Sequence, residues 1–378
     1  LQRAENFFRR AVELDPNFAL AWANLSVVQT FIYAEFEPIT QRLTDAKRAL
    51  DTARRLQPEL GDGYFALGFY RYRGLRDYEG ALKAFEEAIE RGANRAMSLE
   101  FAGYVKRRQG KWEETLAMHD ESSALDPRNP IIFSERAVTL RGMRRFAEAR
   151  TAVDRALDIN TDSPLLLAQK ARIYQAEGDF EAAQKLIDRL PLDPQQPELV
   201  GTYFNQWMYT RQYAEAARAL QDLLANPAPV GKHLAAAYRA RLGAVKRWSG
   251  DVEGGRGDLT IARDEFELLR RQSDGGESFV ESMIVVEALL GDEAAVDRHA
   301  LMLQRQIETD AFYGPALQQA VAAARAHSGQ ADAAIPLLRD LLRKPGDGSL
   351  TTALLRADPI WDPLRNDPRF QELIAAAP

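Results

Sequence analysis

The sequence predicts an all-α fold, an α-solenoid of about nine helix–turn–helix repeats that ends in a C-terminal capping segment. Three observations predict it. Small residues recur at a nearly constant interval, larger residues follow them at helical offsets, and short glycine-containing turns separate the paired helical stretches. The 24 Gly and 18 Pro among 378 residues also favour helices over a loop-rich fold. A prior of about 150 residues per domain would suggest two or three domains, but the repeat predicts one continuous array.

The interval is set by a column of small residues. The spacing is 33 to 35 residues between Ala46 and Ala216, and it is 39 or 40 residues after that. Larger residues follow at offsets of four and seven, as Phe8 and Ala11 follow Ala4, which places all three on one helix face. The column therefore predicts the second helix of each repeat, with a face that a neighbouring helix can approach closely. Its members are Ala4, Ala46, Ala81, Thr115, Ala149, Ala183, Ala216, Gly255, Ala295 and Ala334.

The first helix of each repeat precedes that column and has its own stripe, as with Trp22 and Leu25. Turns at Gly110, Gly178 and Gly250 are predicted to end the first helix and begin the second. Leu-Asp-Pro recurs after the second helix, at 14–16, 125–127 and 192–194. Proline cannot continue a helix, so this tripeptide predicts its end.

Departures from the period predict the organisation of the chain. Residues 1–226 form the regular array, with a truncated first repeat and an extended first helix or ordered loop at 33–38. Residues 227–343 form longer repeats continuous with it, and residues 344–378 form the cap. The sequence Asn226-Pro227-Ala228-Pro229 is predicted to be a bend within the array, and 272–276 to end a long helix.

Three Asp-Pro pairs in the last segment, at 358–359, 362–363 and 367–368, are each predicted to cap a short helical turn. These turns carry apolar residues that are expected to seal the last repeat: Ile360, Trp361, Leu364, Phe370 and Leu373.

The period, together with the partial pattern Trp-Leu-Gly-Tyr, Ala, Phe, Ala and Pro, resembles the tetratricopeptide repeat (TPR) family from residue 1 to about 343. The resemblance implies a right-handed superhelix of helix pairs that binds proteins or peptides. The tail 354–370 is similar to a recurrent ending of bacterial multidomain signalling proteins with C-terminal TPR arrays. In those proteins the array follows a serine/threonine kinase, a nucleotide cyclase or a winged-helix regulator. Because residue 1 already lies within a second helix, we expect the chain to be the C-terminal part of a longer protein or an excised piece of one.

Composition limits the classes of partner. A net charge of −6 lacks the overall basic excess expected of a nucleic-acid-binding protein, and the best basic cluster is only Lys106-Arg107-Arg108. No nucleic-acid role is therefore predicted. The longest apolar runs are far below the roughly 20 residues of a membrane span, so no membrane insertion is predicted either. The chain has no cysteine, and a cytoplasmic location is expected, with a periplasmic one left open.

The sequence shows no constellation of catalytic residues. The four histidines, His119, His233, His299 and His327, are scattered, and two of them stand in the inward column that Phe8 and Phe85 occupy elsewhere. There is no His-Glu-x-x-His pair or nucleophile elbow. Gly231-Lys232 lacks both the leading glycine and the following Ser or Thr of a phosphate-binding loop. No enzymatic activity, metal or cofactor is predicted.

In TPR arrays the first helices line a concave surface, and residues between their core positions face the ligand. By register this surface is predicted to hold aromatic residues followed by an arginine-containing stretch, both favoured in binding sites. Packing against neighbouring helices is an equally good explanation for Phe65, Phe69 and Tyr72. The predicted set is Phe65, Phe69, Tyr72, Phe101, Tyr104, Arg107, Arg108, Glu135, Arg141, Gln169, Arg172, Gln175, Asn205 and Tyr209.

The partner is expected to be a protein or peptide, or an effector domain of the same full-length protein. The Lys/Asn clamp with which some TPR domains bind a chaperone C-terminus is absent, because Phe65, Phe69, Glu100 and Tyr104 stand at its positions. The predicted function is therefore a non-enzymatic binding scaffold in a bacterial signalling protein. The alternative is a small-molecule-sensing module that controls an upstream effector domain, with Trp207, Tyr238 and Trp248 available to line a pocket.

Overall fold

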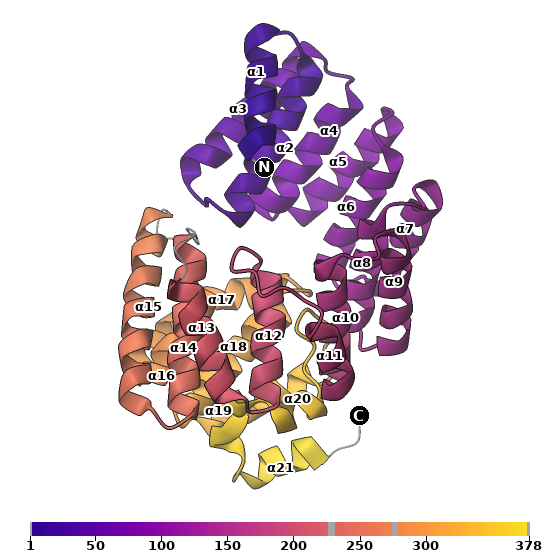
Figure 1. Ribbon diagram of the computed structural model, residues 1–378. Coiled ribbons are helices and arrows are strands. Elements are labelled where there is room, and N and C mark those ends of the chain that lie inside the picture. The colour runs from indigo at the N-terminus through magenta and orange to yellow at the C-terminus, as the bar shows by residue number, and fades with distance from the viewer. Residues whose placement is uncertain (1, 226–230, 274–278, 376–378) are drawn as a thin grey trace. The chain divides into compact units, whose positions relative to one another are not determined.

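The computed structural model describes residues 2–225, 231–273 and 279–375. Within these ranges every regular element is helical, and the helices follow one another in pairs joined by short turns (Figure 1). The all-α prediction is therefore confirmed. The predicted bend at 226–229 lies outside the described residues, as do residues 274–276 of the predicted helix end.

The first helices of the chain are α1 (Gln2–Leu14), α2 (Ala19–Glu35), α3 (Thr40–Leu56), α4 (Gly61–Phe69), the π-helical turn η1 (Tyr70–Leu75), α5 (Tyr78–Glu90), α6 (Arg95–Arg108) and α7 (Trp112–Leu125). Next come α8 (Pro130–Gly142), α9 (Phe146–Ile159), α10 (Pro164–Glu177), α11 (Phe180–Ile187), α12 (Pro197–Tyr209) and α13 (Tyr213–Ala225).

The longer repeats contain α14 (Lys232–Trp248), α15 (Val252–Gln272), α16 (Val280–Leu290), α17 (Glu293–Thr309), α18 (Gly314–His327) and α19 (Ala331–Leu341). The chain ends with α20 (Thr352–Ala357), the 3₁₀ turn η2 (Pro359–Leu364) and α21 (Pro368–Ala375). The 21 residues of α15 and the 17 residues of α14 and α17 account for the longer intervals after Ala216.

The chain divides into two compact units. Unit 1 is Leu1–Ile132 with Arg271–Ser278, and unit 2 is Phe133–Arg270 with Phe279–Pro378. The boundaries predicted after residues 226 and 343 both fall within unit 2, so the compact units follow a different division from the predicted change in repeat length.

The column of small residues is buried in both units. Ala46 and Ala81 in unit 1, and Ala149 and Ala334 in unit 2, are inaccessible to solvent. The first helices also need small residues where a second helix packs closely against them. A Cβ at Gly68 of α4 would lie 2.6 Å from the ring of Phe85 of α5. The histidines His119 and His299, predicted to point inward, are buried too.

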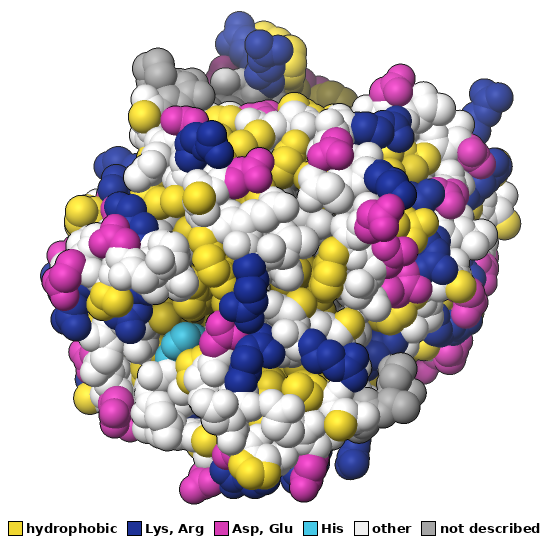
Figure 2. Space-filling view, turned by 60° about the horizontal axis from the view of Figure 1, so that its bottom comes forward, with side chains coloured by type: hydrophobic (Ala, Val, Ile, Leu, Met, Phe, Trp, Pro, Cys, Tyr) yellow, Lys and Arg dark blue, Asp and Glu magenta, His cyan; other side chains and the backbone are white. Residues whose placement is uncertain are grey.

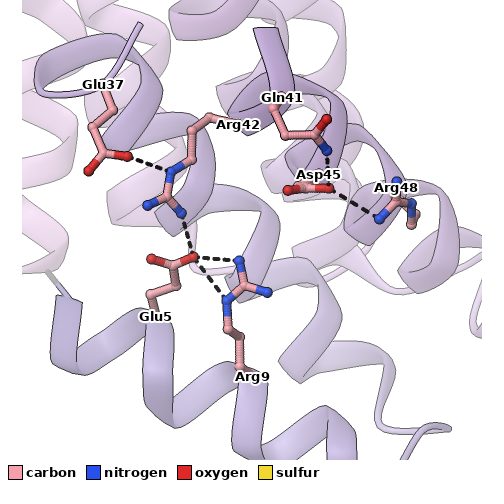
Figure 3. A network of polar contacts seen from close by, with 7 residues as sticks. All are labelled: Glu5, Arg9, Glu37, Gln41, Arg42, Asp45 and Arg48. Carbon is pink, nitrogen blue, oxygen red and sulfur yellow. Dashed lines mark hydrogen bonds and ion pairs between the residues drawn. The ribbon is translucent and has the colours of Figure 1, made fainter. Parts of the chain in front are cut away.

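Unit 1 begins with a polar network that joins α1 to α3 (Figure 3). The buried carboxylate of Glu5 accepts hydrogen bonds of 2.7 Å from Arg9 and from Arg42, and Arg42 also donates to Glu37 at 2.8 Å. Burial alone would raise the pKa of Glu5, but the two guanidinium groups outweigh it and lower the pKa. The charged form of Glu5 therefore stabilises this end of unit 1.

The turn between first and second helices places one residue in the left-handed region, where glycine is strongly favoured. The predicted turn glycines Gly110, Gly178 and Gly250 have φ values of 74°, 88° and 98°. Three arginines adopt the same conformation at equivalent places in other repeats: Arg76, Arg144 and Arg211, with φ values of 54°, 59° and 56°. A non-glycine residue in this region costs about 1 kcal/mol, so these arginines need a compensating role.

The C-terminal cap of unit 2 forms as predicted in its apolar part. Trp361 and Phe370 are inaccessible to solvent and pack with Leu338 and Leu341 of α19. The carboxylate of Asp358 caps η2 by accepting a 3.0 Å hydrogen bond from the Ile360 N–H. The cap prediction for Asp362 is wrong, because its carboxylate forms ion pairs with Arg211 and Arg365 instead.

Candidate functional site

The predicted aromatic patch of unit 1 is largely core packing. Phe65, Phe69 and Tyr72 are only 5%, 2% and 4% exposed. The ring of Phe101 lies 5.5 Å from that of Phe65 and 5.3 Å from that of Phe69, measured between centroids. Phe101 and Tyr104 remain half-buried, so they are the aromatic members of the predicted site that a ligand could still reach in unit 1.

The two arginines predicted beside this patch are also buried. Arg108 donates a 3.2 Å hydrogen bond from Nε to the hydroxyl of Tyr72. The guanidinium of Arg107 lies over the ring of Tyr104, 5.3 Å from its centroid. Both side chains are at most 5% exposed, which makes them part of the packing between neighbouring helices.

Most of the predicted residues in unit 2 contact other parts of the chain. Gln169 donates to the Ser134 carbonyl at 2.7 Å, and Gln175 donates to the Thr202 carbonyl at 3.0 Å. The rings of Tyr209 and Phe180 lie 5.4 Å apart. Arg141 forms an ion pair with Asp347, described below, and Glu135 is half-buried.

Arg172 of α10 and Asn205 of α12 differ from these neighbours. Both are half-buried, and within the described residues neither has a hydrogen bond or an ion pair with another side chain or backbone group. Burial lowers the pKa of Arg172, and the nearby positive charge of Arg141 lowers it further. Of the residues predicted in unit 2, these two are the best placed to contact a ligand, and the set as a whole stays a prediction.

A segment of the chain itself runs across two earlier repeats of unit 2, those of α8 and α10. We call residues 342–351, which join α19 to α20, the return segment. Its backbone meets the end of α8, where the Gly346 N–H donates to the Gly142 carbonyl at 3.1 Å. Its Ser349 hydroxyl donates to the Arg141 carbonyl at 2.9 Å, and its Thr351 hydroxyl donates to the Ala176 carbonyl of α10 at 2.9 Å. The return segment is thus bound along the ends of successive first helices.

Arginines supply further contacts to this segment and to the C-terminal residues after it. Arg141 forms a 2.6 Å ion pair with Asp347, and the Arg141 side chain is only 7% exposed. Arg144 donates to three carbonyls, those of Leu341 at 2.7 Å, Lys344 at 3.0 Å and Leu350 at 3.0 Å. In the next but one repeat, Arg211 forms two 2.9 Å hydrogen bonds with the carboxylate of Asp362.

These contacts give two of the three left-handed arginines a role. Arg144 and Arg211 project from turns, where a glycine could not hold the C-terminal residues. Neither arginine was predicted to bind another part of the chain, although the interval of 34 residues from Gly110 and Gly178 places Arg144 at the same turn position. The signal was an arginine where the repeat otherwise has glycine.

The aromatic residues considered for a small-molecule pocket lie in a core cluster of unit 2. Trp207 is 6% exposed and Tyr238 is inaccessible to solvent, and Trp248 packs against the same cluster. The Tyr238 hydroxyl donates to the Pro194 carbonyl at 2.9 Å. Their side chains fill space between α12, α13 and α14, so they do not line an open pocket.

Two further findings concern the described part of the chain. No group of three or more His, Asp or Glu residues in it is arranged to hold a metal ion. None of its helices combines the length and the apolar composition needed to span a membrane.

Comparison with known proteins agrees with this architecture. Residues 140–202 match the family model described as tetratricopeptide repeat. This stretch matches the repeat family, and the paired helices of the described residues have the fold of a TPR array. No curated protein matches the sequence.

Solved structures similar to the TPR array include yeast Tom70, at 11% identity and a TM-score of 0.53, covering 90% of this chain and 86% of that one. A tetratricopeptide repeat protein from Parabacteroides merdae ATCC 43184 has 16% identity and a TM-score of 0.47, covering 67% of this chain and 98% of that one. YrrB, described as a TPR protein with an unusual peptide-binding site, has 16% identity and a TM-score of 0.34, covering 48% of this chain and 89% of that one. At these identities the likeness concerns the fold.

Proposed function

We propose that the chain is a non-enzymatic scaffold that binds an extended segment of a partner protein. The return segment carries this proposal. Unit 2 already binds ten of its own residues through one ion pair and through hydrogen bonds to their backbone, which is how a repeat array recognises a peptide. TPR arrays typically act as non-enzymatic scaffolds, and this supports the same proposal.

The binding face that we propose in unit 2 is the surface of α10 and α12 that carries Arg172 and Asn205. A half-buried guanidinium and a half-buried amide can each make several hydrogen bonds, and these two side chains make none to the described residues. A partner segment along this face would supply the missing acceptors and donors. The polar contacts that Arg141 and Gln175 make within the chain would hold their side chains in place beside it.

We further propose that the array is the regulatory or partner-sensing part of a larger bacterial signalling protein. The similarity of the tail 354–370 to the ending of such proteins supports this, and their effector domains are one class of partner. The test is to determine which protein domain is encoded upstream of Leu1. A kinase, cyclase or winged-helix domain would support it, and a domain without a signalling role would contradict it.

Peptide binding is tested with the full chain and a phage-displayed library of random peptides. Enriched peptides are synthesised, and their affinities are compared between the native chain and the double variant Arg172→Gln/Asn205→Ala. We expect a loss of about tenfold or more, equivalent to about 1.4 kcal/mol. The matched control is Arg218→Gln/Asn160→Ala, which changes the same residue types at exposed positions.

Retained affinity in the Arg172/Asn205 variant would move the binding site elsewhere. Failure of the native chain to enrich any peptide would contradict peptide binding itself. Circular dichroism and the midpoint of thermal unfolding show whether each variant is folded.

A further inference from the structure

Arg241 of α14 is held in an unusual environment. Its guanidinium carbon lies 5.2 Å from the centroid of the Phe204 ring and 5.9 Å from that of the Tyr238 ring. Its Nη1 atom is buried without a hydrogen-bond partner. Among the described residues no carboxylate forms an ion pair with it. Arg241 is therefore a half-buried cation that contacts aromatic faces, and its buried Nη1 has no acceptor among the described residues.

Such an arrangement is costly unless something completes it. A guanidinium stays charged in proteins, and a buried donor without an acceptor costs about 1–3 kcal/mol or more. Burial lowers the pKa of Arg241, and the contact with Tyr238 compensates only in part. Aromatic faces attract the cation but cannot accept its planar set of N–H groups as a carboxylate does.

The backbone of α12 passes close to the guanidinium. Gly201 of α12 lies against it, and a Cβ at that position would be 3.7 Å from Nη2 of Arg241. The glycine keeps the side of α12 next to Arg241 free of a side chain. This space is adjacent to Asn205, which is one helical turn further along α12.

A second unpaired guanidinium lies on the other side of α12. Helix α10, which carries Arg172, is joined to α12 by the hydrogen bond from Gln175 to the Thr202 carbonyl. Helix α14, which carries Arg241, packs on α12 through Val200, Trp207 and Leu242. The acidic groups that act on the pKa values in this region are Asp347 and the exposed Glu198 for Arg172, and Glu198 and Asp193 for Tyr238. Within the described residues Glu198 has no ion pair with either arginine.

The surface of the molecule shows the same combination of side chains. On the face that comes forward in Figure 2, Lys and Arg side chains gather beside hydrophobic side chains near the middle of the view. Basic groups with apolar surroundings are thus available on the outside of the molecule as well as at Arg241.

We propose that Arg241 and Arg172 are anion-binding residues that receive the carboxylate side chains of an acidic peptide lying along α12. This inference rests on the peptide binding proposed above and names the chemistry of the peptide. Unit 2 contains its own precedents, because Arg141 binds the carboxylate of Asp347 and Arg211 binds that of Asp362 in the C-terminal residues. Arg241 would add the contact that its aromatic neighbours cannot make.

The experiment uses the full chain and isothermal titration at constant ionic strength. The probes are hexaglutamate, hexaserine as the uncharged control, and inorganic phosphate. We expect hexaglutamate to bind the native chain and Arg241→Gln to weaken that binding about tenfold or more. Arg172→Gln is expected to weaken it by a smaller factor. The matched control Arg218→Gln makes the same change in charge on the exposed face of α13 and is expected to bind as the native chain does.

A second variant guards against misfolding of Arg241→Gln. Gly201→Ala keeps every charge but fills the space next to the guanidinium, and it is expected to weaken hexaglutamate binding while phosphate affects neither variant. Equal binding of hexaglutamate by the native chain and Arg241→Gln would overturn the inference. Binding of phosphate alone, or of neither anion, would overturn it as well.

The outcome is separable from that of the proposed function. Library peptides that bind the native chain and Arg241→Gln equally well would leave peptide binding standing and remove the acidic site. If no library peptide binds but hexaglutamate does, the anion site would stand and the chain would recognise only acidic peptides.

Discussion

Units 1 and 2 build the same helix pairs but use the inner positions of their first helices differently. In unit 1 these positions hold Phe65 and Phe69, which are buried and whose rings pack against each other. In unit 2 they hold Arg141, which is paired with Asp347, and Arg172, which has no hydrogen-bond or ion-pair partner among the described residues. The contrast shows that register places a residue on a face, whereas the size and charge of its neighbours decide whether that residue is core or surface.

The units also differ in what stabilises them beyond the helix pairs. Unit 1 has the Glu5 network between α1 and α3, whereas unit 2 has the return segment and a cap around Trp361. The four predictions below test this difference, in order of decreasing effect.

Trp361→Ala tests whether the cap stabilises unit 2 alone. Trp361 is inaccessible to solvent, and removing a buried tryptophan side chain costs about 3–5 kcal/mol of unfolding free energy. Hydrogen exchange should show lost protection in α18, α19 and α21 and unchanged protection in α4, α5 and α6. The matched variant is Phe85→Ala in unit 1, which should give the opposite pattern. Equal loss of protection in both units after either substitution would contradict a separate role for the cap.

Arg144→Ala tests the contribution of the return segment. Its guanidinium donates to the carbonyls of Leu341, Lys344 and Leu350, and losing hydrogen bonds from a charged group costs about 2–3 kcal/mol. Arg144→Gly loses the same bonds but relieves the left-handed backbone at φ 59°, so it should be about 1 kcal/mol more stable than Arg144→Ala. Urea unfolding of both variants measures the free energy lost with the hydrogen bonds and the cost of the left-handed backbone. An alanine variant as stable as the native chain would show that the return segment adds nothing.

The response to pH should separate the units as well. Burial raises the pKa of Asp358 to about 6 from an ordinary value of 3.8. The folded unit therefore binds this proton more tightly than the unfolded chain does. The resulting stabilisation is fully present below pH 3.8 and is lost as the pH rises through about 6, with a loss of about 2 kcal/mol between about pH 4 and pH 7.

The effect of Glu5 in unit 1 has the opposite sign. Its pKa is lowered from 4.5, so its stabilisation is present above that value and is lost as the pH falls below it. Unfolding measured between about pH 4 and pH 7 should be less pH-dependent in Asp358→Asn, which can still cap η2. Glu5→Gln should leave that dependence unchanged above about pH 5, because the effect of Glu5 lies at lower pH. If Asp358→Asn follows the native pH profile, Asp358 does not titrate in this range.

The smallest predicted effect is the loss of a helix cap, and its cost should be the same in both units. Asp77 caps α5 in unit 1 and Asp179 caps α11 in unit 2, and each accepts a 2.9 Å hydrogen bond from a backbone N–H. Replacing either one by alanine should cost about 1 kcal/mol of unfolding free energy, because the cap is local. A cost in unit 2 several times that in unit 1 would mean that the return segment amplifies local damage.

The sequence predicted the helix pairs because their information is local and repeated. Burial of the column at Ala46, Ala81 and Ala149 follows from offsets of three and four, and the left-handed turns at Gly110 and Gly178 follow from glycine itself. The extended helix ending at Glu35 and the cap around Trp361 could be read in the same way.

The candidate site was less predictable because it depends on contacts between distant residues. Phe69 shares its register with accessible positions of other repeats, but the rings of Phe31 and Phe101 cover it at 6.4 Å and 5.3 Å. Nothing near Arg141 in the sequence points to Asp347, 206 residues away. Arg241 was missed for a related reason, since its unpaired state appears only when Phe204, Tyr238 and Gly201 surround it.

The ion pair between Arg141 and Asp347 also affects how the chain can fold during synthesis. Helix α8 leaves the ribosome long before residue 347 does, and at roughly 5–20 residues per second the delay is tens of seconds. Until then Arg141, Arg144 and the Ala176 carbonyl lack the partners that they have in the native structure. The helix pairs α2/α3, α4/α5 and α6/α7 need only sequence neighbours. The last contacts of unit 2 therefore form only after almost the whole chain has been made, so a chain interrupted before Asp347 exposes the surface that the return segment covers.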